Sequence, residues 1–471
     1  MARVQVPLAG ARQVDRAFAV NAQRSINLYP EVEGDGAKAI LTMKPTPGLR
    51  LLAQAGNGPR RSHSVEFDGA IYFVSGGSLV CVSVTWAVTI IGSLNTNEGW
   101  CGIVAGRSSI LVVDGGDGYT YNGTTFAVVS DPDFPAAPTV CGYMDGYFIV
   151  NDTGTDQFSI SANEDPTAWD ALDFATAESD PDDSVAITTS FRDLYLIGSL
   201  TTQVYFNSGN ADFPFDLYAN GVLEFGTPAP ASVVRAGGNI FMLAASRNSS
   251  ATIVRLNGFQ AQKIADPDIA YTLGRMTTIT DAVGMAYTQD DQTFYELTFP
   301  SEDITLVYHL EQDMWHERRS AGMGRHRALG HGYFNRQHVV GDYDNGNLYA
   351  LDPATFTDNG ATITRQRVAS ILSREARQIE INELEIEFKR GVGLLSGQGQ
   401  QPRAMLRYSF DGGNTWSREL WREIGALGDY ARRAIWHRLG QGEHFVIEVT
   451  VTDPVEAILI GAYADVNVLD A

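Results

Sequence analysis

The sequence predicts an all-β fold: a β-propeller of six or seven blades, an extended N-terminal arm and a C-terminal β-sandwich-like domain. Three observations favour this fold class. A turn pair followed at once by alternating large apolar residues recurs about seven times between Val65 and Ala350. Successive copies start 38 to 53 residues apart, which is typical of repeats built from several short strands. Glycine is abundant, with 47 residues, as many tight turns require.

Each turn pair marks the expected start of one blade. The seven pairs are Asp68-Gly69, Arg107-Ser108, Asp145-Gly146, Arg192-Asp193, Gly237-Gly238, Asp290-Asp291 and Asn335-Arg336. The residues after them, such as AIYFV after the first pair, have the pattern of a short buried strand. Seven starts fit either a six-blade or a seven-blade ring, and the spacing leaves the number open.

The chain divides into three predicted regions. Residues 1–60 are expected to form an arm, because prolines and the EGDG turn at Glu33–Gly36 interrupt them. The arm is expected to complete the ring by adding a strand to the last blade, which would cover an exposed edge. Residues 61–360 are assigned to the propeller. Residues 361–471 contain alternating stretches such as RQIEINELEIEFKR and HFVIEVTV, which predict five or more strands of a separate sandwich-like domain.

The formal charge of −22 is unevenly distributed. Residues 61–360 carry 13 basic and 37 acidic residues, whereas residues 1–60 carry a net charge of +4 and residues 361–471 a net charge of −2. A strongly acidic ring repels phosphates, so binding to a nucleic-acid backbone is not expected. Two interpretations stay open: the charge serves solubility alone, or it makes a surface past which a polyanion slides.

Composition argues against membrane and disulfide-rich classes. No run of eighteen apolar residues predicts a membrane span, and the N-terminus lacks the apolar core of a signal peptide. The three cysteines, Cys81, Cys101 and Cys141, are expected to be reduced, buried thiols.

No catalytic or cofactor motif is found, so the chain is not expected to be an enzyme or to hold a cofactor or metal. The patterns GxGxxG, GxxxxGK[ST], GxSxG and HExxH are absent. Five histidines between His309 and His338 lack the spacing of metal ligands. Loops beginning at Asp114 and Asp342 are predicted to be hairpin turns with aspartate bonded to the backbone. A calcium loop at Asp342 is less favoured, because Pro353 occupies the position of the last acidic ligand.

The segment YSFDGGNTWS has the spacing of an Asp-box hairpin, which sialidases and many other β proteins contain. Its residues are Ser409, Asp411, Gly413, Thr415 and Trp416. Asp411 is expected to accept hydrogen bonds from turn amides while Trp416 packs beneath the hairpin, so the role predicted here is structural. A sialidase would also need an arginine cluster and a tyrosine nucleophile, and no such set is recognisable.

Two loops are candidates for an interface or a gate, although a spacer role is the simpler interpretation. One is Asn207–Phe215, with Asn207 followed by the aromatic–proline tip Phe213, Pro214 and Phe215; the other is Gly391–Gln401. Four arginines are spread along the arm and are expected to contact an acidic neighbouring subunit, if they have a specific role. They are Arg3, Arg12, Arg16 and Arg24.

An ordered set of segments resembles one protein family. VNAQRSINLYPE (Val20–Glu31) is followed by KPTPGL (Lys44–Leu49), then by VYFNSGNADFPF (Val204–Phe215), and near the C-terminus by DGGNTWS, IWHRLG and TVTDPVEAILIGAYADV. The signature residues in the arm are Asn21, Ser25, Ile26, Asn27, Leu28, Tyr29, Pro30, Glu31, Pro45, Pro47 and Gly48. This set is similar to the packaged-DNA-stabilisation proteins, which are the tail hub or nozzle proteins of short-tailed bacteriophages.

The resemblance implies a structural virion protein that is assembled in the host cytoplasm. It implies a hexameric tail nozzle that retains packaged DNA and lets double-stranded DNA pass through its lumen without sequence-specific binding. It also implies contacts with the adaptor or portal-side ring, with tail fibres or spikes, and with the host envelope at infection. The main alternative is a glycan-binding or glycan-cleaving propeller acting on the host surface. A protein-binding scaffold is a third hypothesis, weakened by the absence of the GH…WD pattern.

Overall fold

The computed structural model describes residues 2–14, 22–34, 36, 38–177, 182–210, 213–373 and 377–469. Across these residues the structure is almost entirely β, with one α-helix, α1 (Pro267–Leu273), and one 3-10 helix, η1 (Pro230–Ser232). The chain forms two compact units. The ring unit comprises Leu51–Glu302 and Arg327–Leu351, and the sandwich unit comprises Met1–Arg50, Asp303–His326 and Asp352–Ala471.

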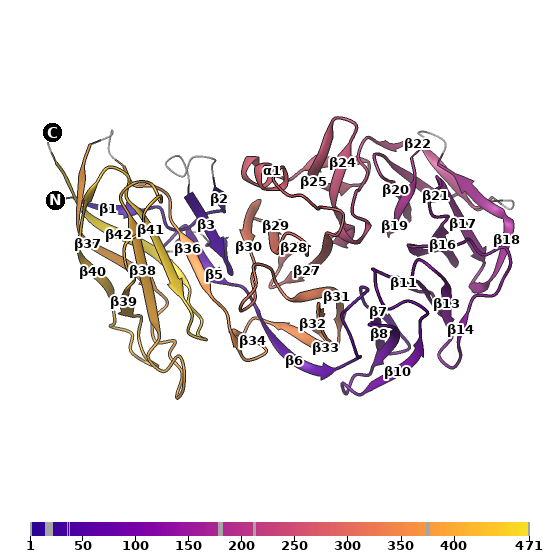
Figure 1. Ribbon diagram of the computed structural model, residues 1–471, viewed down its shortest axis with the longest axis horizontal. Helices are drawn as coiled ribbons and strands as arrows, with labels where there is room; N and C mark the ends of the chain where they lie inside the picture. Colours follow the sequence, from indigo (N-terminus) through magenta and orange to yellow (C-terminus); the bar gives the residue numbers. More distant parts are fainter. Residues whose placement is uncertain are drawn as a thin grey trace. The chain divides into compact units, whose positions relative to one another are not determined.

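The ring unit is built from small antiparallel sheets in which strands pair in sequence order (Figure 1). Five sheets consist of four consecutive strands each. They are β7 (Val65–Phe67), β8 (Ala70–Ser75), β9 (Ser78–Val82) and β10 (Val88–Ser93); β11 (Gly102–Ala105), β12 (Ile110–Val113), β13 (Gly118–Tyr121) and β14 (Phe126–Val128); β15 (Cys141–Met144), β16 (Tyr147–Asn151), β17 (Gln157–Ala162) and β18 (Asp165–Thr176); β19 (Ser184–Ser190), β20 (Asp193–Gly198), β21 (Thr202–Asn207) and β22 (Phe215–Leu223); and β23 (Val234–Ala236), β24 (Asn239–Ser246), β25 (Ser249–Asn257) and β26 (Gln260–Lys263).

Two further groups of strands complete the ring unit. The hairpin of β27 (Val283–Gln289) and β28 (Gln292–Phe299) follows the fifth sheet. The last sheet has the order β31 (Ala328–Phe334), β32 (Gln337–Asp342), β33 (Asn347–Asp352) and β6 (Gly48–Gln54). Its fourth strand therefore comes from the N-terminal part of the chain, and residues 51–54 of this strand belong to the ring unit. Among the residues that the structure describes, seven successive strand groups lie around the ring, which favours seven blades over six.

The seven turn pairs lie at the first hairpin of these seven groups. In five of them both turn residues have positive φ, as at Asp68 (47°) and Gly69 (70°) or Asn335 (48°) and Arg336 (60°). Such turns match the right-handed twist of the strands that they connect. The local signal in the sequence is therefore a signal for turn geometry.

Apolar side chains between neighbouring sheets hold the ring together. Tyr72 and Val74 of the first sheet pack with Ile110 and Val112 of the second. The last sheet packs against the first in the same way, through a cluster that joins Phe73, Val80 and Val82 to Val339 and Leu348. Because the last sheet contacts the first, the sheets close into a ring, which Figure 1 shows. Closure of this kind protects sheet edges from pairing with other chains.

The sandwich unit combines strands from both ends of the chain. One sheet has the order β4 (Leu28–Val32), β5 (Leu41–Pro45), β42 (Leu459–Val468), β37 (Ile379–Phe388) and β40 (Ala434–Gly442), with β1 (Ala2–Val6) also paired to β42. The other contains β29 (Ile304–His309), β30 (Met314–Glu317), β3 (Ala22–Ile26), β36 (Arg365–Val368), β41 (Val446–Val451), β38 (Arg403–Ser409) and β39 (Leu420–Glu423), with β2 (Gln13–Val14) on β3. The short strands β34 (Thr357–Asp358) and β35 (Ala361–Thr362) pair with each other.

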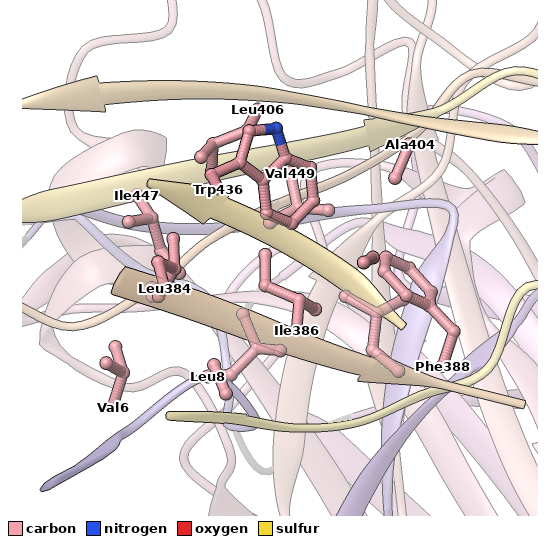
Figure 2. Close-up of a cluster of buried hydrophobic side chains, with 14 of the residues drawn as sticks. Val6, Leu8, Leu384, Ile386, Phe388, Ala404, Leu406, Trp436, Ile447 and Val449 are labelled. Carbon is pink, nitrogen blue, oxygen red and sulfur yellow. The ribbon is translucent and has the colours of Figure 1, made fainter. Parts of the chain in front are cut away.

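One apolar core fills the sandwich unit (Figure 2). Alternate residues of β37, Leu384, Ile386 and Phe388, point into it and are at most 3% exposed. Trp436 of β40 is fully buried, and its indole N–H donates to the carbonyl of Leu420 at 2.9 Å. The indole is thus satisfied without a solvent contact, as a buried tryptophan requires. Figure 2 shows Val6 and Leu8 from the N-terminal part of the chain in the same cluster.

The two units divide the chain differently from the predicted regions 1–60, 61–360 and 361–471. Most arm strands pair within the sandwich unit, and residues 303–326 group with them. Pairing between strands hundreds of residues apart leaves no local pattern in a sequence, so composition alone did not indicate this grouping. β6 lies where an arm strand was expected to join the last blade, while the domain boundaries themselves stay predictions.

Candidate functional sites

The arm signature lies in and around four strands, within the residues 1–50 that belong to the sandwich unit. Ser25 and Ile26 end β3, Leu28 to Glu31 belong to β4, Pro45 ends β5, and Gly48 begins β6. Asn21 lies outside the described residues. The structure therefore brings the described signature residues together in one unit.

Asn27 joins the arm to two distant segments. Its side-chain amide donates to the carbonyls of Arg319 at 2.9 Å and Thr364 at 2.8 Å, and its side-chain oxygen accepts from the Arg319 backbone N–H at 2.9 Å. Its backbone N–H donates to the Glu317 carbonyl at 2.9 Å. The residue is 1% exposed and has a φ of 54°, a conformation that asparagine tolerates better than most residues. A buried side-chain amide that both donates and accepts, on a backbone with positive φ, suits asparagine at this signature position.

Glu317 is a buried carboxylate held by three arginines. Arg12 Nε lies 2.8 Å from Glu317 Oε1, Arg24 Nη2 lies 3.0 Å from Oε2, and Arg319 Nη2 lies 2.8 Å from Oε2. Burial alone would raise the pKa of Glu317, but the arginines, Arg24 and Arg12 foremost, lower it to about 2. We call Arg12, Arg24, Asn27, Glu317 and Arg319 the arm clasp. The clasp fixes the N-terminal segment to residues 317–319, and its chemistry is structural.

Three of the four arm arginines pair with acids of their own chain, and a contact with a neighbouring subunit stays a prediction for the partly exposed Arg3 and Arg24. Arg12 and Arg24 pair with an acid of their own chain, and Arg3 pairs with Glu385 of β37. Arg12 is too buried to contact a neighbouring subunit, and Arg16 lies outside the described residues. Sequence reasoning missed Glu317, because the surrounding residues MWHE have the pattern of an ordinary strand.

The remaining signature residues make close packing contacts. The Tyr29 ring lies 5.7 Å from that of His309 and 6.1 Å from that of His316, measured between centroids. Lys44 Nζ contacts Glu31 Oε1 at 2.7 Å across the β4–β5 pair.

Gly48 and Pro47 bring two backbone segments together. The Gly48 N–H donates to the Thr355 carbonyl at 2.8 Å, and a Cβ at Gly48 would lie 2.3 Å from that oxygen. Arg318 Nη2 donates to the Pro47 carbonyl at 2.6 Å. Only glycine permits this approach of one backbone to another.

The Asp-box segment forms a closed turn. Asp411 Oδ1 accepts from the Thr415 N–H at 2.8 Å and from the Ser409 hydroxyl at 2.6 Å, while Oδ2 accepts from the Thr415 hydroxyl at 2.6 Å. The Gly413 N–H donates to the Ser409 hydroxyl at 2.8 Å. These bonds lower the pKa of Asp411. Trp416 packs against Val368 and Val446, so the segment is bonded to itself and to the core.

The aromatic tip of the loop Asn207–Phe215 faces inward. Phe215 is 2% exposed and Pro214 is buried, and Phe213 packs against Phe158 with 5.8 Å between ring centroids. Among the described loop residues, Ser208–Asn210 are the exposed ones. An interface or gate role for this loop stays a prediction, and it would rest on those polar residues. In the other candidate loop, Gly391–Gln401, Leu395 is 83% exposed.

The centre of the ring unit contains a cavity of about 890 Å³. Residues of the first strand in each of the seven groups, or just before it, line the cavity. The charged lining residues are Arg60, Arg61, Arg235, Glu98 and Asp281. The lining of this cavity is therefore not acidic, although residues 61–360 as a whole are strongly acidic.

Metal and membrane features are not found among the described residues. Nowhere in them do three or more His, Cys, Asp or Glu side chains form a group able to hold a metal ion. His309 and His316 belong to the sandwich unit, whereas His331 and His338 belong to the ring unit. The three cysteines are free thiols. In the described part of the chain, no helix has both the length and the apolar character needed to cross a membrane.

A closed ring of small antiparallel sheets joined to a β-sandwich defines an all-β propeller–sandwich protein. The family model described as bacteriophage P22 Gp10, beta-propeller, matches residues 4–356, and the one described as bacteriophage P22 Gp10, beta-sandwich, matches residues 364–467. The chain belongs to the bacteriophage P22 Gp10 family, and it is a structural protein of the phage tail and a component of the virion. The predicted fold class and family resemblance are confirmed.

Other similarities are distant. No curated protein matches the chain. Among solved structures, virginiamycin B lyase from Staphylococcus aureus is 11% identical, with a TM-score of 0.45 over 63% of this chain and 95% of the lyase. PorZ of Porphyromonas gingivalis is 12% identical, with a TM-score of 0.38 over 80% and 46%. An exo-beta-1,3-galactanase from Phanerochaete chrysosporium is 9% identical, with a TM-score of 0.29 over 78% and 95%. Similarity at this level says nothing about the activity of this chain.

Proposed function

We propose that this chain forms the tail nozzle, or hub, of a short-tailed phage. In this proposal six copies surround the tail axis, retain the packaged DNA and conduct it during ejection. The observation that carries the proposal is the match of the P22 Gp10 models to both the propeller and the sandwich, over nearly the whole chain. We further propose assembly in the host cytoplasm, docking to the adaptor or portal-side ring and to tail fibres or spikes, and contact with the host envelope at infection.

The structure suits a part that bears mechanical load. The ring closes on itself through apolar clusters, and the N-terminal segment is bonded to distant parts of its own unit through the arm clasp. Interdigitated cores resist deformation, because small displacements break many contacts at once. A conduit for pressurised DNA needs that rigidity.

Charge supports passage without adhesion. Each chain carries −22, so a six-copy assembly carries about six times that charge, and like charge repels the phosphates of DNA. We place the acidic excess on outer faces of the ring unit that border the channel of the assembly. The cavity at the axis of one ring has neither the charge nor the volume of a DNA conduit.

Two experiments test the nozzle proposal. Native mass measurement of the purified protein should give six copies of 51.2 kDa, about 307 kDa, alone or after addition of the adaptor ring. Phage carrying a nonsense codon early in the gene should fill their heads and then lose the DNA, so that empty particles accumulate. Particles that keep their DNA and eject it normally without this protein would contradict the proposal.

The glycan alternative is tested with the same preparation. A nozzle releases no reducing sugar from host polysaccharide and binds no member of a glycan panel. Release of sugar by purified wild-type protein would favour the alternative, and the effect of replacing carboxylates in turn would then locate the active pair.

A further inference from the structure

Three histidines lie where the seventh strand group of the ring meets its two neighbours. His331 belongs to β31 and His338 to β32 of the seventh group, whereas His63 lies just before β7 of the first group. All three belong to the ring unit, and each is half-buried. Protons from solvent can therefore reach side chains that lie at the closure of the ring.

The His338 ring joins the seventh group to the sixth. Its Nε2 lies 2.8 Å from the carbonyl oxygen of Thr288 in β27, and its Nδ1 lies 3.0 Å from His331 Nε2. A carbonyl oxygen can only accept, so His338 Nε2 carries the hydrogen and His338 Nδ1 is the acceptor. His331 Nε2 then donates to His338, and each of these two neutral rings is fixed in one tautomer.

His63 joins the seventh group to the first. Its Nδ1 accepts the backbone N–H of His331 at 3.3 Å, while the His331 carbonyl accepts the Ser64 N–H at 3.0 Å. His63 Nδ1 must lack a hydrogen to accept this bond, so the neutral ring carries its hydrogen on Nε2. These two hydrogen bonds hold residues 63–64 against β31.

The surroundings favour the neutral form of all three rings. Burial, and then the charge of Arg60, lower the pKa of His63 to about 4. Burial, and then the charges of the other two rings and of Arg60, lower the pKa of His331 well below its usual range. Burial also lowers the pKa of His338, although its bond to the Thr288 carbonyl opposes this shift.

No acid compensates a proton on these rings. Tyr287 of β27 and Tyr333 of β31 lie against His338, with ring centroids 5.6 and 5.0 Å away. Among the described residues no carboxylate forms an ion pair with any of the three histidines. This holds for the acids on adjacent elements and in the cavity lining, which are Glu98, Asp281, Asp290, Asp291 and Asp342.

We propose that His63, His331 and His338 form a pH-sensitive latch, the histidine latch, that loosens the closure of the ring on acidification. A second proton on His338 must go to Nδ1, the atom that accepts the hydrogen of His331 Nε2. A second proton on His63 must likewise go to Nδ1, the atom that accepts the His331 backbone N–H. Either event places two N–H groups against each other and breaks a hydrogen bond of the latch. The proposal concerns a single chain, so it is independent of the nozzle proposal.

Acid weakens the closure because the rings bind protons more tightly when the latch is open. A histidine whose pKa is lower in the folded form adds stability that is fully present above about pH 6.5 and is lost as pH falls toward the folded value. For His63 the pKa is ordinarily 6.5 and about 4 in the closed ring. At pH 5 this difference alone lowers the ratio of closed to open ring by about thirtyfold.

Hydrogen–deuterium exchange of the full-length protein at pH 7.5 and pH 5.0 tests the latch, after correction for the intrinsic effect of pH on exchange. Protection of β27, β31 and residues 61–67 should fall by about thirtyfold or more at the lower pH. Protection of β16 and β20, in the third and fourth strand groups, should stay unchanged.

Two variants separate the latch from a merely structural role. His63→Asn keeps an acceptor for the His331 N–H but takes up no proton, so its acid-induced loss should be about thirtyfold smaller than that of wild type. His338→Gln keeps a donor for the Thr288 carbonyl and should also show a smaller loss. His437→Gln is the control, because His437 is an exposed histidine of the sandwich unit, and its loss should equal that of wild type.

Three results would overturn the proposal. They are wild-type protection of β31 that is equal at the two pH values, an acid-induced loss in both latch variants as large as that of wild type, and an equal loss of protection in β16. If His63→Asn fails to fold, the comparison of His338→Gln with wild type decides alone.

Discussion

Arg12 Nε lies 2.8 Å from Glu317 Oε1, although 305 residues separate the two along the chain. Arg24 and Arg319 contact the same carboxylate, which is 1% exposed. The N-terminal segment is thus anchored by a charge cluster in the interior of its unit. Removing one member of such a cluster leaves uncompensated charge in a low-dielectric environment.

Glu317→Gln should destabilise the sandwich unit by about 3–5 kcal/mol, because three arginines then lose their shared counter-charge. Denaturant unfolding followed by tryptophan fluorescence measures the change, since Trp315, Trp416 and Trp436 lie in that unit. Glu419→Gln is the matched control: Glu419 is exposed, and its change should stay below about 0.5 kcal/mol. Equal stability of the two variants would show that the clasp contributes nothing.

The clasp also predicts an acid-sensitive stability. The pKa of Glu317 is about 2 in the folded protein and ordinarily 4.5. A lowered folded-state pKa adds stability that is fully present above pH 4.5 and is lost as pH falls through 2. The contribution is about 3 kcal/mol at neutral pH. The free-energy gap between wild type and Glu317→Gln should therefore narrow as pH falls from 5 toward 2, and a constant gap would contradict the assignment.

Gly48→Ala should destabilise the protein by about 2 kcal/mol or more, because the new Cβ would lie 2.3 Å from the Thr355 carbonyl oxygen. Gly34→Ala is the matched control, since no atom lies within 4 Å of a Cβ at that position. Thermal unfolding of both variants separates the steric effect from the general effect of replacing glycine. A Tm for Gly48→Ala equal to that of the control would show that the backbone at Thr355 moves freely.

Two substitutions at first-hairpin turns should have opposite effects on the free energy of unfolding. Gly69 has a φ of 70°, so Gly69→Ala should cost about 1 kcal/mol through strain alone, because its Cβ would meet no atom within 4 Å. Arg336 occupies the equivalent second turn position with a φ of 60°, so Arg336→Gly should stabilise the ring by about 0.5 kcal/mol. Urea midpoints check both. If the two urea midpoints shift in the same direction, backbone φ at these positions does not determine the stability of the turns.

The ring was predictable because its information is local. Each first hairpin has a turn pair and an apolar strand within ten residues, so the seven starts were readable from pattern alone. The arm clasp was not readable, because Arg12 and Glu317 meet only after the strands between them have paired. The aromatic tip Phe213–Phe215 illustrates the same limit: its composition suits an exposed contact loop, yet the tip fills space between two sheets.

A cryo-electron microscopy reconstruction of the virion tail tests the nozzle proposal most directly. Ring and sandwich units of this chain should fit the density below the adaptor ring as six copies around the tail axis, with DNA density in the channel between copies. A tail whose axial tube contains no copy of this chain, or holds copies only on peripheral fibres, would contradict it.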